Sequence, residues 1–478
     1  MVKQIIEIDG VKRELNEHEL ELITIKDQHR SDVFFLKNSL GTIEIKSDID
    51  ELIIRESNVD GVGIVNATIE QLCIDQNSKL KRLILKNSKV KNLAIEDSSV
   101  ELIEIENNDS CPIETLKVNN SRCGNFKSIC TSINLIQLIN SHFSKFWHKS
   151  ASKFCNLEIE QGLIVDSGFK FESYSSKNIS LKDSIDGRLD ISFGDVDNLE
   201  LSNLFLTNEL SLSAKQGVKV FSVSGFNCGS GKLSFHDFHA LANASQTSVL
   251  FQSISFGESD FKDCDFCSFE HFEIDKVQFQ SASSTGTKWP LDPVYKSSNS
   301  LLQSYCFKVY KMLVDDGDLD QGLQFRRRYL NTKVSLLKSE ESESKLVAWA
   351  DRVSLQLGEF TSQHGTNWLK ALLILLCFNL VLTPILVNLF TLEKSFESAV
   401  FYCSHIKESF NYYWLSLVPI DGKVFSMSDA LLSMNPAHKL SSLSFKGDTW
   451  FVLYNTISRA INGYLYFQII KSFRKYIT

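Results

Sequence analysis

Histidine and cysteine side chains at two places in the chain have spacings that could hold a metal ion. His236 and His239 stand three residues apart, and so do Cys264 and Cys267. Zinc binds imidazole nitrogens and thiolates, so either pair could contribute ligands. Cys264, however, falls on a small position of a five-residue pattern in the surrounding sequence, which explains its spacing without a metal. We therefore interpret both pairs as structural and predict no metal site.

Motifs of nucleophilic catalysis and of nucleotide binding are missing from the sequence. It contains no Gly-x-Ser-x-Gly, no Walker-type phosphate loop and no Gly-x-Gly-x-x-Gly in a strand–helix context. No cluster of acidic residues that could support catalysis on one face is readable either. We therefore predict that the protein is not an enzyme, and expect no catalytic residue and no cofactor.

Arg459 is an ionisable residue inside an apolar segment, residues 450–470. A charge near the centre of a bilayer costs roughly several kcal/mol, so such residues usually face a partner, a cavity or water. Candidate partners are Asn379 and Asn388, in the apolar segment 369–392, an acid between the two segments, or another copy of the chain. Arg459, Asn379 and Asn388 are therefore the candidate intramembrane functional residues.

The two apolar segments have the length of membrane spans. Residues 371–392 carry no charged side chain, and about 20 apolar residues cross a hydrocarbon core of roughly 30 Å. A buried core helix is the alternative for this segment. The segment 450–470 could instead lie in the membrane interface, with Arg459 reaching the headgroups. We predict spans at about 369–392 and 450–470.

Basic residues flank both segments. The arginine run before the first span could contact lipid headgroups, or it could be a solvated helix face paired with nearby acids. The basic end after the second span favours the cytoplasmic side of a membrane. Six residues are candidate contacts for lipid headgroups or a partner: Arg326, Arg327, Arg328, Lys471, Arg474 and Lys475.

An apolar residue recurs at every fifth position between Ile54 and Ile105, with a single slip after Ile74. A five-residue period fits neither an α-helix nor an ordinary strand. The positions two residues earlier alternate between bulky and small side chains, beginning with Leu52 and Ser57. A chain that turns a corner every five residues points one residue of each side inward, and four sides make a coil of about twenty residues. The pattern predicts a stacked solenoid.

Two local units, Ser259-Asp260-Phe261 and Cys264-Asp265-Phe266, combine a small residue, an acid and Phe. They resemble the consensus of pentapeptide-repeat proteins, and the likeness is looser over residues 54–105. The resemblance implies an all-β, right-handed quadrilateral β-helix over residues 1–290. The spacing wanders between about 125 and 250, where we expect irregular coils rather than a new domain.

Two prolines in the segment Trp289–Pro293 mark the end of the β-region. The apolar period then becomes helical, which predicts an α-helical hairpin linker over residues 291–345. This hairpin and the segment Ile457–Gln468 resemble uncharacterised bacterial membrane proteins that combine pentapeptide-like repeats with a C-terminal two-span module. The resemblance implies an amphipathic helix followed by a two-helix transmembrane module over residues 346–478. It implies no particular activity.

The first residues, Met1–Gly10, are charged early and have no long apolar core, which is untypical of a signal peptide. We therefore expect the β-helix to stay in the cytoplasm. Two spans would return the C-terminus to the same side, in agreement with its basic residues. The predicted location is the inner (cytoplasmic) membrane of a bacterium.

The net charge of −8 and the dispersed Lys and Arg residues give no basic surface for nucleic acid. The eleven cysteines show no even framework, which is typical of free thiols in a reducing compartment. We expect no nucleic-acid partner. Membrane lipids, a protein ligand and further copies of the chain, as a homo-oligomer, are the predicted partners.

The favoured hypothesis is a non-enzymatic inner-membrane protein whose β-helix serves as a binding or assembly module coupled to two spans. The alternative is an oligomeric membrane-perturbing or pore-forming effector of a defence or toxin system. A third hypothesis is a DNA-mimicking binder of topoisomerases, as known among soluble pentapeptide-repeat proteins. The acidic chain allows this third function, but attachment to a membrane makes it awkward.

Overall fold

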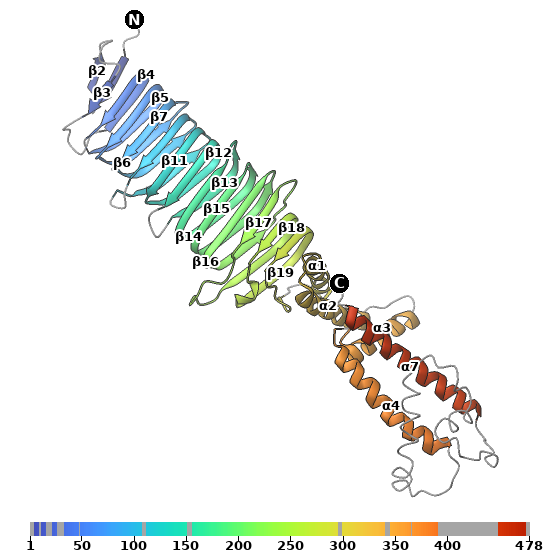
Figure 1. The fold of residues 1–478 in the computed structure, drawn as a ribbon. Coiled ribbons are helices and arrows are strands. Elements are labelled where there is room, and N and C mark those ends of the chain that lie inside the picture. The colour runs from blue at the N-terminus through green and yellow to red at the C-terminus, as the bar shows by residue number, and fades with distance from the viewer. Residues whose placement is uncertain are drawn as a thin grey trace, which may run out of the picture. The chain divides into compact units, whose positions relative to one another are not determined.

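The computed structural model divides the chain into two compact units, Met1–Asp318 and Leu319–Thr478. The first unit is a stack of β-strands followed by one helix, and the second is helical (Figure 1). The structure describes the following residues: 4–8, 11–15, 22–25, 33–46, 48–107, 111–150, 155–294, 299–339, 345–364, 366–390 and 448–474.

The first unit is a large parallel β-solenoid whose 19 strands form one sheet. Ile49 lies beside Ile69, and Thr68 lies beside Lys89, so corresponding residues are 20 and 21 positions apart. Apart from those of β1, the strand pairings of the described residues are parallel. The strands are β1 (Gln4–Ile8), β2 (Val11–Leu15), β3 (Leu22–Ile25), β4 (Val33–Ile45), β5 (Ile49–Val65), β6 (Thr68–Asp75), β7 (Lys79–Lys86), β8 (Lys89–Glu96), β9 (Ser99–Glu106), β10 (Ile113–Asn119), β11 (Arg122–Thr131), β12 (Ile133–Ser150), β13 (Asn156–Val165), β14 (Phe169–Asp186), β15 (Leu189–Leu206), β16 (Glu209–Ser224), β17 (Lys232–His236), β18 (Ser248–Lys262) and β19 (His271–Thr285).

The five-residue positions of the sequence fill the interior of the solenoid. Every apolar residue of the series from Ile54 to Ile105 is at most 1% exposed, and the residues two positions earlier are buried as well. Each five-residue side therefore contributes two inward residues. Because each fully buried aliphatic side chain stabilises the fold by about 1.5–3 kcal/mol, the stack supplies a continuous core. The predicted solenoid is confirmed.

Asparagine and aspartate occupy corners of the coil in the left-handed backbone conformation. Asn66, Asn87 and Asp97 have φ values of 54°, 48° and 48°. These residue types tolerate this region better than other non-glycine residues, because their short polar side chains can form local hydrogen bonds. Ser88 and Ser98 follow two of these corners and point into the interior. An Asn-Ser or Asp-Ser pair therefore marks a turn of the coil.

The inward serines bind the backbone of the neighbouring turn. Ser88 Oγ lies 3.0 Å from the carbonyl oxygen of Ile64 and accepts a hydrogen bond from the backbone N–H of Ala67 at 3.3 Å. Ser78 Oγ lies 3.1 Å from the carbonyl oxygen of Ile54 in the same way. A hydroxyl group is tolerated inside a core only when it is paired. These serines thus join successive turns of the solenoid.

The stretch with irregular spacing stays within the solenoid. Strands β11 to β18 continue the same sheet, which confirms that no new domain interrupts it. The irregularity takes the form of register shifts, one of them between Phe193 and Asp195. Gly194 lies at this shift, and a Cβ atom there would be 2.1 Å from the carbonyl oxygen of Tyr174. Glycine is needed because the backbones approach so closely.

The ends of the solenoid depart from the regular coil. At the N-terminal end, β1 and β2 form an antiparallel hairpin that also pairs with β4, where the sequence predicts further β-helix. At the other end Trp289 is 2% exposed and lies 4.8 Å from Phe266 between ring centroids. Helix α1 (Asn299–Asp315) follows, and its Tyr305 hydroxyl donates to the carbonyl oxygen of Pro290 at 3.0 Å.

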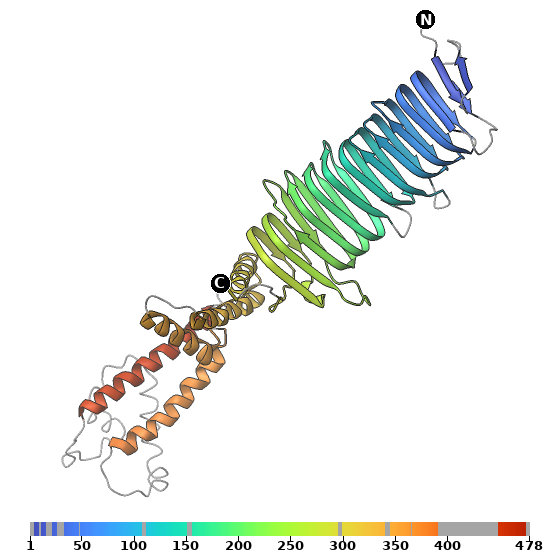
Figure 2. The same ribbon diagram turned by 180° about the vertical axis from the view of Figure 1, so that it is seen from behind.

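The described helices of the second unit are α2 (Leu319–Ser339), α3 (Lys345–Ser362), α4 (Trp368–Phe390) and α7 (Asp448–Arg474). Helices α4 and α7 pack side by side around Leu375 and Leu465 (Figure 2). The structure therefore confirms helices at both segments where the sequence predicts spans. Among the described residues, no helix has both the length and the apolar character that a membrane crossing requires.

Candidate functional site

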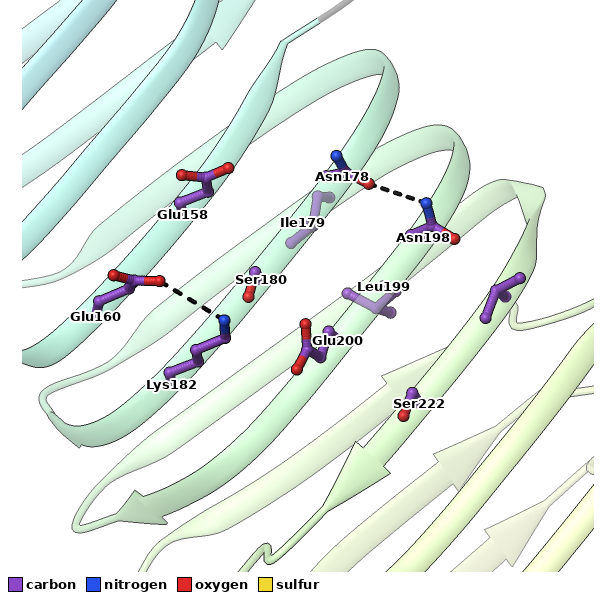
Figure 3. Close-up of a pocket in the computed structure, with 11 residues that line it drawn as sticks. Glu158, Glu160, Asn178, Ile179, Ser180, Lys182, Asn198, Leu199, Glu200 and Ser222 are labelled. Carbon is purple, nitrogen blue, oxygen red and sulfur yellow. Dashed lines mark hydrogen bonds and ion pairs between the residues drawn. The ribbon is translucent and has the colours of Figure 1, made fainter.

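The solenoid carries a shallow groove of about 440 Å³ across four neighbouring strands, β13 to β16. Glu158, Ser180, Glu200 and Ser222 lie in one row, with one residue on each strand (Figure 3). Because short serine side chains alternate with longer glutamates, hollows remain between the carboxylates. The row therefore presents carboxylates on a rigid sheet surface, with the Ser180 hydroxyl buried between them.

Polar contacts hold the walls of the groove. Asn198 Nδ2 donates to Asn178 Oδ1 at 2.9 Å, which links β15 to β14 (Figure 3). Lys182 Nζ lies 3.6 Å from Glu160 Oε1, which links β14 to β13. These side chains come from strands whose backbones are already paired, so the shape of the groove is fixed before a ligand binds.

The groove is acidic, because three glutamates and one lysine line it. Glu160 is paired with Lys182, and Glu158 Oε2 accepts a hydrogen bond from Gln137 Nε2 at 2.7 Å. Glu200 forms no ion pair with the part of the chain that the structure describes. Fixed carboxylates of this kind attract cationic ligands, and salt screens the attraction. The groove can therefore bind a basic segment.

A pair of amide side chains joins α4 to α7. Asn379 Nδ2 donates to Asn462 Oδ1 at 2.9 Å, and Asn462 Nδ2 donates back to Asn379 Oδ1 at 3.0 Å. Asn379 Nδ2 also donates to the carbonyl oxygen of Leu375 at 2.8 Å. The two asparagines are 1% and 0% exposed. The reciprocal bonds satisfy amide groups whose burial would otherwise be costly.

Three of the four buried residues in the described part of α7 are polar. Its buried residues are Asn462, Leu465, Gln468 and Ser472. Gln468 Oε1 accepts a hydrogen bond from Ser362 Oγ, at the end of α3, at 2.8 Å. Leu465 supplies the apolar contact with α4. Side-chain hydrogen bonds and apolar packing therefore both hold α7 against its neighbours.

The large exposed side chains of α4 and α7 are apolar instead, whereas α3 also exposes Asp351, Ser354 and Gln356. In a helical bundle surrounded by water, apolar residues face inward and polar residues face outward. On α4 and α7, Asn379 and Asn462 are buried beside Leu375 and Leu465, and large apolar side chains are exposed. The large apolar side chains concerned are between 47% and 65% exposed: Trp349, Leu357, Phe360, Leu369, Leu373, Leu380, Val381, Ile457, Phe467 and Ile470.

Arg459 lies on α7, three residues before Asn462, and its side chain is partly exposed. Asn379, one of its predicted partners, exchanges amide hydrogen bonds with Asn462, which sequence reasoning did not name. Asn388 belongs to α4, but its side chain lies outside the described residues. Asn379 thus contacts α7, the helix that carries Arg459, but it does so through Asn462, which the sequence did not single out.

The basic candidates separate into two groups. Arg327 Nη2 lies 2.6 Å from Glu359 Oε1, in agreement with the alternative of an arginine run paired with an acid. Arg328 is partly exposed on the same helix. Burial lowers the pKa of Lys471, and the charge of Arg326 lowers it further. The side chains of two other candidates lie outside the described residues: Arg474 and Lys475.

The predicted structural role of Cys264 is confirmed. Cys264 is 1% exposed, with its Sγ 3.5 Å from the carbonyl oxygen of Phe235, whereas Cys267 is exposed. His239 Nδ1 lies 2.8 Å from the carbonyl oxygen of Asp237. Within the described ranges, no three His, Cys, Asp or Glu side chains are grouped as metal ligands.

A cysteine–histidine contact inside the solenoid escaped the sequence analysis. Cys155 Sγ lies 3.6 Å from His148 Nε2, and both residues are 0% exposed. Burial lowers the pKa of His148 to about 3 and raises the pKa of the Cys155 thiol far above its usual value. Both groups are neutral at pH 7, and a neutral enclosed thiol is a poor nucleophile. The contact is therefore structural, although its residue types are those of a catalytic pair.

No protein-family model, no curated protein sequence and no solved structure matches this chain. The solenoid has parallel coils and, between Leu52 and Ile105, two inward positions in each five-residue side. The structure supports a repeat protein that consists of a β-solenoid followed by helices.

Proposed function

We propose that this protein is a membrane-attached binding module, in which α4 and α7 enter the bilayer and the solenoid binds a protein partner. The observation that carries the proposal is the reversed polarity of this helix pair. Asn379 and Asn462 are buried between the helices, while Leu373, Leu380 and Phe467 are exposed outside. In water, the exposed apolar surface would be unfavourable. In lipid, the apolar surface is solvated and the paired amides help to hold the helices together.

The lengths of the two helices support the proposal, although neither is apolar enough along its described residues to be a candidate span. Helix α4 has 23 residues and α7 has 27. At 1.5 Å per residue, their lengths of about 35 and 40 Å exceed a hydrocarbon core of roughly 30 Å. The uncharged run of residues 371–392 begins directly after Lys370, whose Nζ lies 3.3 Å from the carbonyl oxygen of Glu359. Trp368 begins α4, where an interfacial aromatic residue is favourable.

We propose that the groove on the solenoid recognises a basic segment of a protein partner. Its carboxylates stand on paired strands, so binding needs little ordering of the site. Glu200 offers a carboxylate for an ion pair with an incoming Lys or Arg, and Ser180 and Ser222 leave room beside it. The role is recognition without a catalysed reaction, in a protein that holds its partner at the membrane surface.

We infer a location in the inner membrane, with the solenoid on the cytoplasmic side. The buried cysteines of the solenoid support this, because they are free thiols, as expected in a reducing compartment. The basic residues after α7 support the same side for the C-terminus. Four buried thiols carry the argument: Cys123, Cys155, Cys228 and Cys264.

Membrane fractionation of the full chain tests the proposal. We expect the protein to stay in the membrane pellet after alkaline carbonate washing. The double variant Leu373→Lys/Leu380→Lys should move into the soluble fraction, because each lysine costs roughly 2.5–3.5 kcal/mol in a spanning segment. Tyr174→Lys, at an exposed aromatic residue of the solenoid, is the matched control and should remain in the pellet. Wild-type protein in the soluble fraction would contradict the proposal.

The same cells distinguish a binding module from a membrane-perturbing effector. A potential-sensitive dye reports whether induced expression depolarises the membrane. A binding module should leave the potential unchanged. Depolarisation by the wild type that Arg459→Leu abolishes would favour the effector hypothesis instead.

A further inference from the structure

The groove on the solenoid holds two carboxylates at a fixed spacing. Glu158 of β13 and Glu200 of β15 both lie opposite Ser180 of the strand between them, β14 (Figure 3). Because paired strands lie about 4.8 Å apart, the backbones that carry the two glutamates are separated by roughly 9.6 Å along the solenoid. The register of the three strands sets this distance before a ligand binds.

The charges of these two carboxylates are available to a ligand. Glu200 forms no ion pair with the described residues. Glu158 Oε2 accepts a hydrogen bond from Gln137 Nε2 at 2.7 Å, and this neutral amide orients the carboxylate without cancelling its charge. The lysine that lines the groove, Lys182, lies 3.6 Å from a third acid, Glu160. The groove therefore offers two carboxylates to two cations of a partner.

The walls of the groove limit the shape of the ligand. Asn178 and Lys182 stand on β14, two residues before and two residues after Ser180 (Figure 3). Four residues of a strand span about 13 Å between Cα atoms, and the wall side chains narrow this width further. An α-helix with its side chains is about 10–12 Å across, so it would collide with the walls. A single extended chain that runs along the row fits instead.

The spacing of the carboxylates distinguishes two extended conformations. In a β-strand, side chains on one side recur at every second residue, about 6.6 Å apart. In a polyproline II helix they recur at every third residue, and a rise of about 3.1 Å per residue places them about 9.3 Å apart. The second distance matches the separation of the two glutamates, whereas the first does not.

One wall offers hydrogen-bonding groups to the main chain of such a ligand. Polyproline II has no internal hydrogen bonds, so its backbone groups can bind other partners. Asn198 Nδ2 donates to Asn178 Oδ1 at 2.9 Å. This bond leaves Asn178 Nδ2 as a donor and Asn198 Oδ1 as an acceptor, and neither bonds to the described residues. Both asparagines are exposed along the row of carboxylates.

We propose that the groove binds a polyproline II segment of a protein partner, in which Lys or Arg recurs at every third residue. One cation pairs with Glu158 and the next pairs with Glu200. The two residues between the cations pass over Ser180, whose short side chain leaves room for them. The inference rests on the proposed recognition of a basic segment and specifies its conformation and spacing. Proline between the cations should favour binding, because it holds the segment in this conformation.

Calorimetric titration of the detergent-solubilised full chain at low ionic strength tests the spacing. Three proline-rich peptides have the same composition and carry two arginines, separated by one, two or three prolines. The peptide with two intervening prolines should bind about threefold tighter than the other two, because it alone reaches both carboxylates. Glu158→Gln leaves one carboxylate, so the three peptides should then bind alike. Glu114→Gln, at an exposed position outside the groove, is the matched control and should keep the preference.

Three outcomes would overturn the proposal. Equal affinities of the wild type for the three peptides would remove the spacing rule and leave the recognition of basic segments intact. A preference that survives in Glu158→Gln would place the second cation elsewhere. Tighter binding of a helical peptide with arginines seven positions apart would assign the groove to a helix. If no basic peptide binds at all, the proposed recognition function fails as well, so the two failures are distinguishable.

Discussion

Asn379 and Asn462 lie 83 positions apart in the sequence and exchange two amide hydrogen bonds of 2.9 and 3.0 Å between α4 and α7. Replacing either residue by leucine removes both reciprocal hydrogen bonds from the other amide in a buried interface. We expect each single variant to lower the free energy of unfolding by about 1–2 kcal/mol. The double variant should lose less than the sum, with a coupling of about 0.6–1.7 kcal/mol.

A double-mutant cycle in detergent, with unfolding followed by circular dichroism, measures this coupling. The control cycle uses Leu373→Ala and Phe467→Ala, on the outer faces of the same helices. These two changes should be additive. If the asparagine variants are additive as well, the reciprocal pairing does not exist in solution.

The inward serines offer a second prediction. Ser88→Ala removes a hydroxyl that contacts Ile64 O and the N–H of Ala67 on the neighbouring turn. Because the N–H of Ala67 loses its partner in a buried site, the variant should lose about 1–3 kcal/mol in the free energy of unfolding. Ser99→Ala deletes the same hydroxyl at a position without such contacts and should change stability by less than about 0.5 kcal/mol. Urea titration measures both, and equal losses would refute a bonding role for Ser88.

The buried His148 predicts a pH dependence of stability. Its pKa is about 3 in the folded protein, whereas an unfolded histidine titrates near 6.5. Below about pH 6.5 the unfolded chain therefore binds one more proton, so the free energy of unfolding falls as the pH drops towards 3. The slope from this residue approaches about 1.4 kcal/mol per pH unit and vanishes above the unfolded pKa.

Urea unfolding at neutral pH and at about pH 5 measures this slope. His148→Phe should reduce the difference between the two conditions by roughly 1–2 kcal/mol. His271→Phe, at an exposed position, should leave the difference unchanged. A His148→Phe variant with the full wild-type difference would show that His148 is not buried in a neutral form.

The acidic groove predicts binding of a basic peptide. A short arginine-rich peptide should bind the full chain at low ionic strength, and binding should weaken as salt is added. Glu200→Gln should weaken binding by about threefold to tenfold, because it removes a carboxylate that forms no ion pair with the described residues. Glu114→Gln, at an exposed position outside the groove, should have no effect. Calorimetric titration that finds equal affinities for both variants would separate peptide binding from the groove.

The sequence predicted the solenoid because its signal is local. The series from Ile54 to Ile105 repeats a rule that depends only on neighbouring residues, and burial follows it without exception. The same register correctly assigned Cys264 to the interior. The antiparallel hairpin of β1 and β2 lacked such a signal, and the sequence analysis extended the β-helix across it.

The contacts of the candidate sites depend on long-range packing instead. The pairing of Asn462 was not predicted, because its partner is distant in the chain. An asparagine in an apolar helix does not by itself indicate which residue it faces. Cys155 and His148 are seven residues apart, near the end of β12 and just before β13, and they touch because both side chains point into the interior. The Asn-Ser and Asp-Ser corners, such as Asn87-Ser88, are a repeated dipeptide in the sequence. This dipeptide could have predicted where the coil turns.

The accessibility of Cys377 tests the membrane attachment most directly. This exposed cysteine lies on the outer face of α4, and the exposed Cys267 of the solenoid is its natural control. Each is labelled with a nitroxide, in variants without the other cysteines, and the protein is reconstituted in vesicles. We predict that the label at Cys377 collides with oxygen and is shielded from a water-soluble nickel reagent, as in lipid, whereas Cys267 shows the reverse. Equal collision with the nickel reagent at both positions would contradict the account.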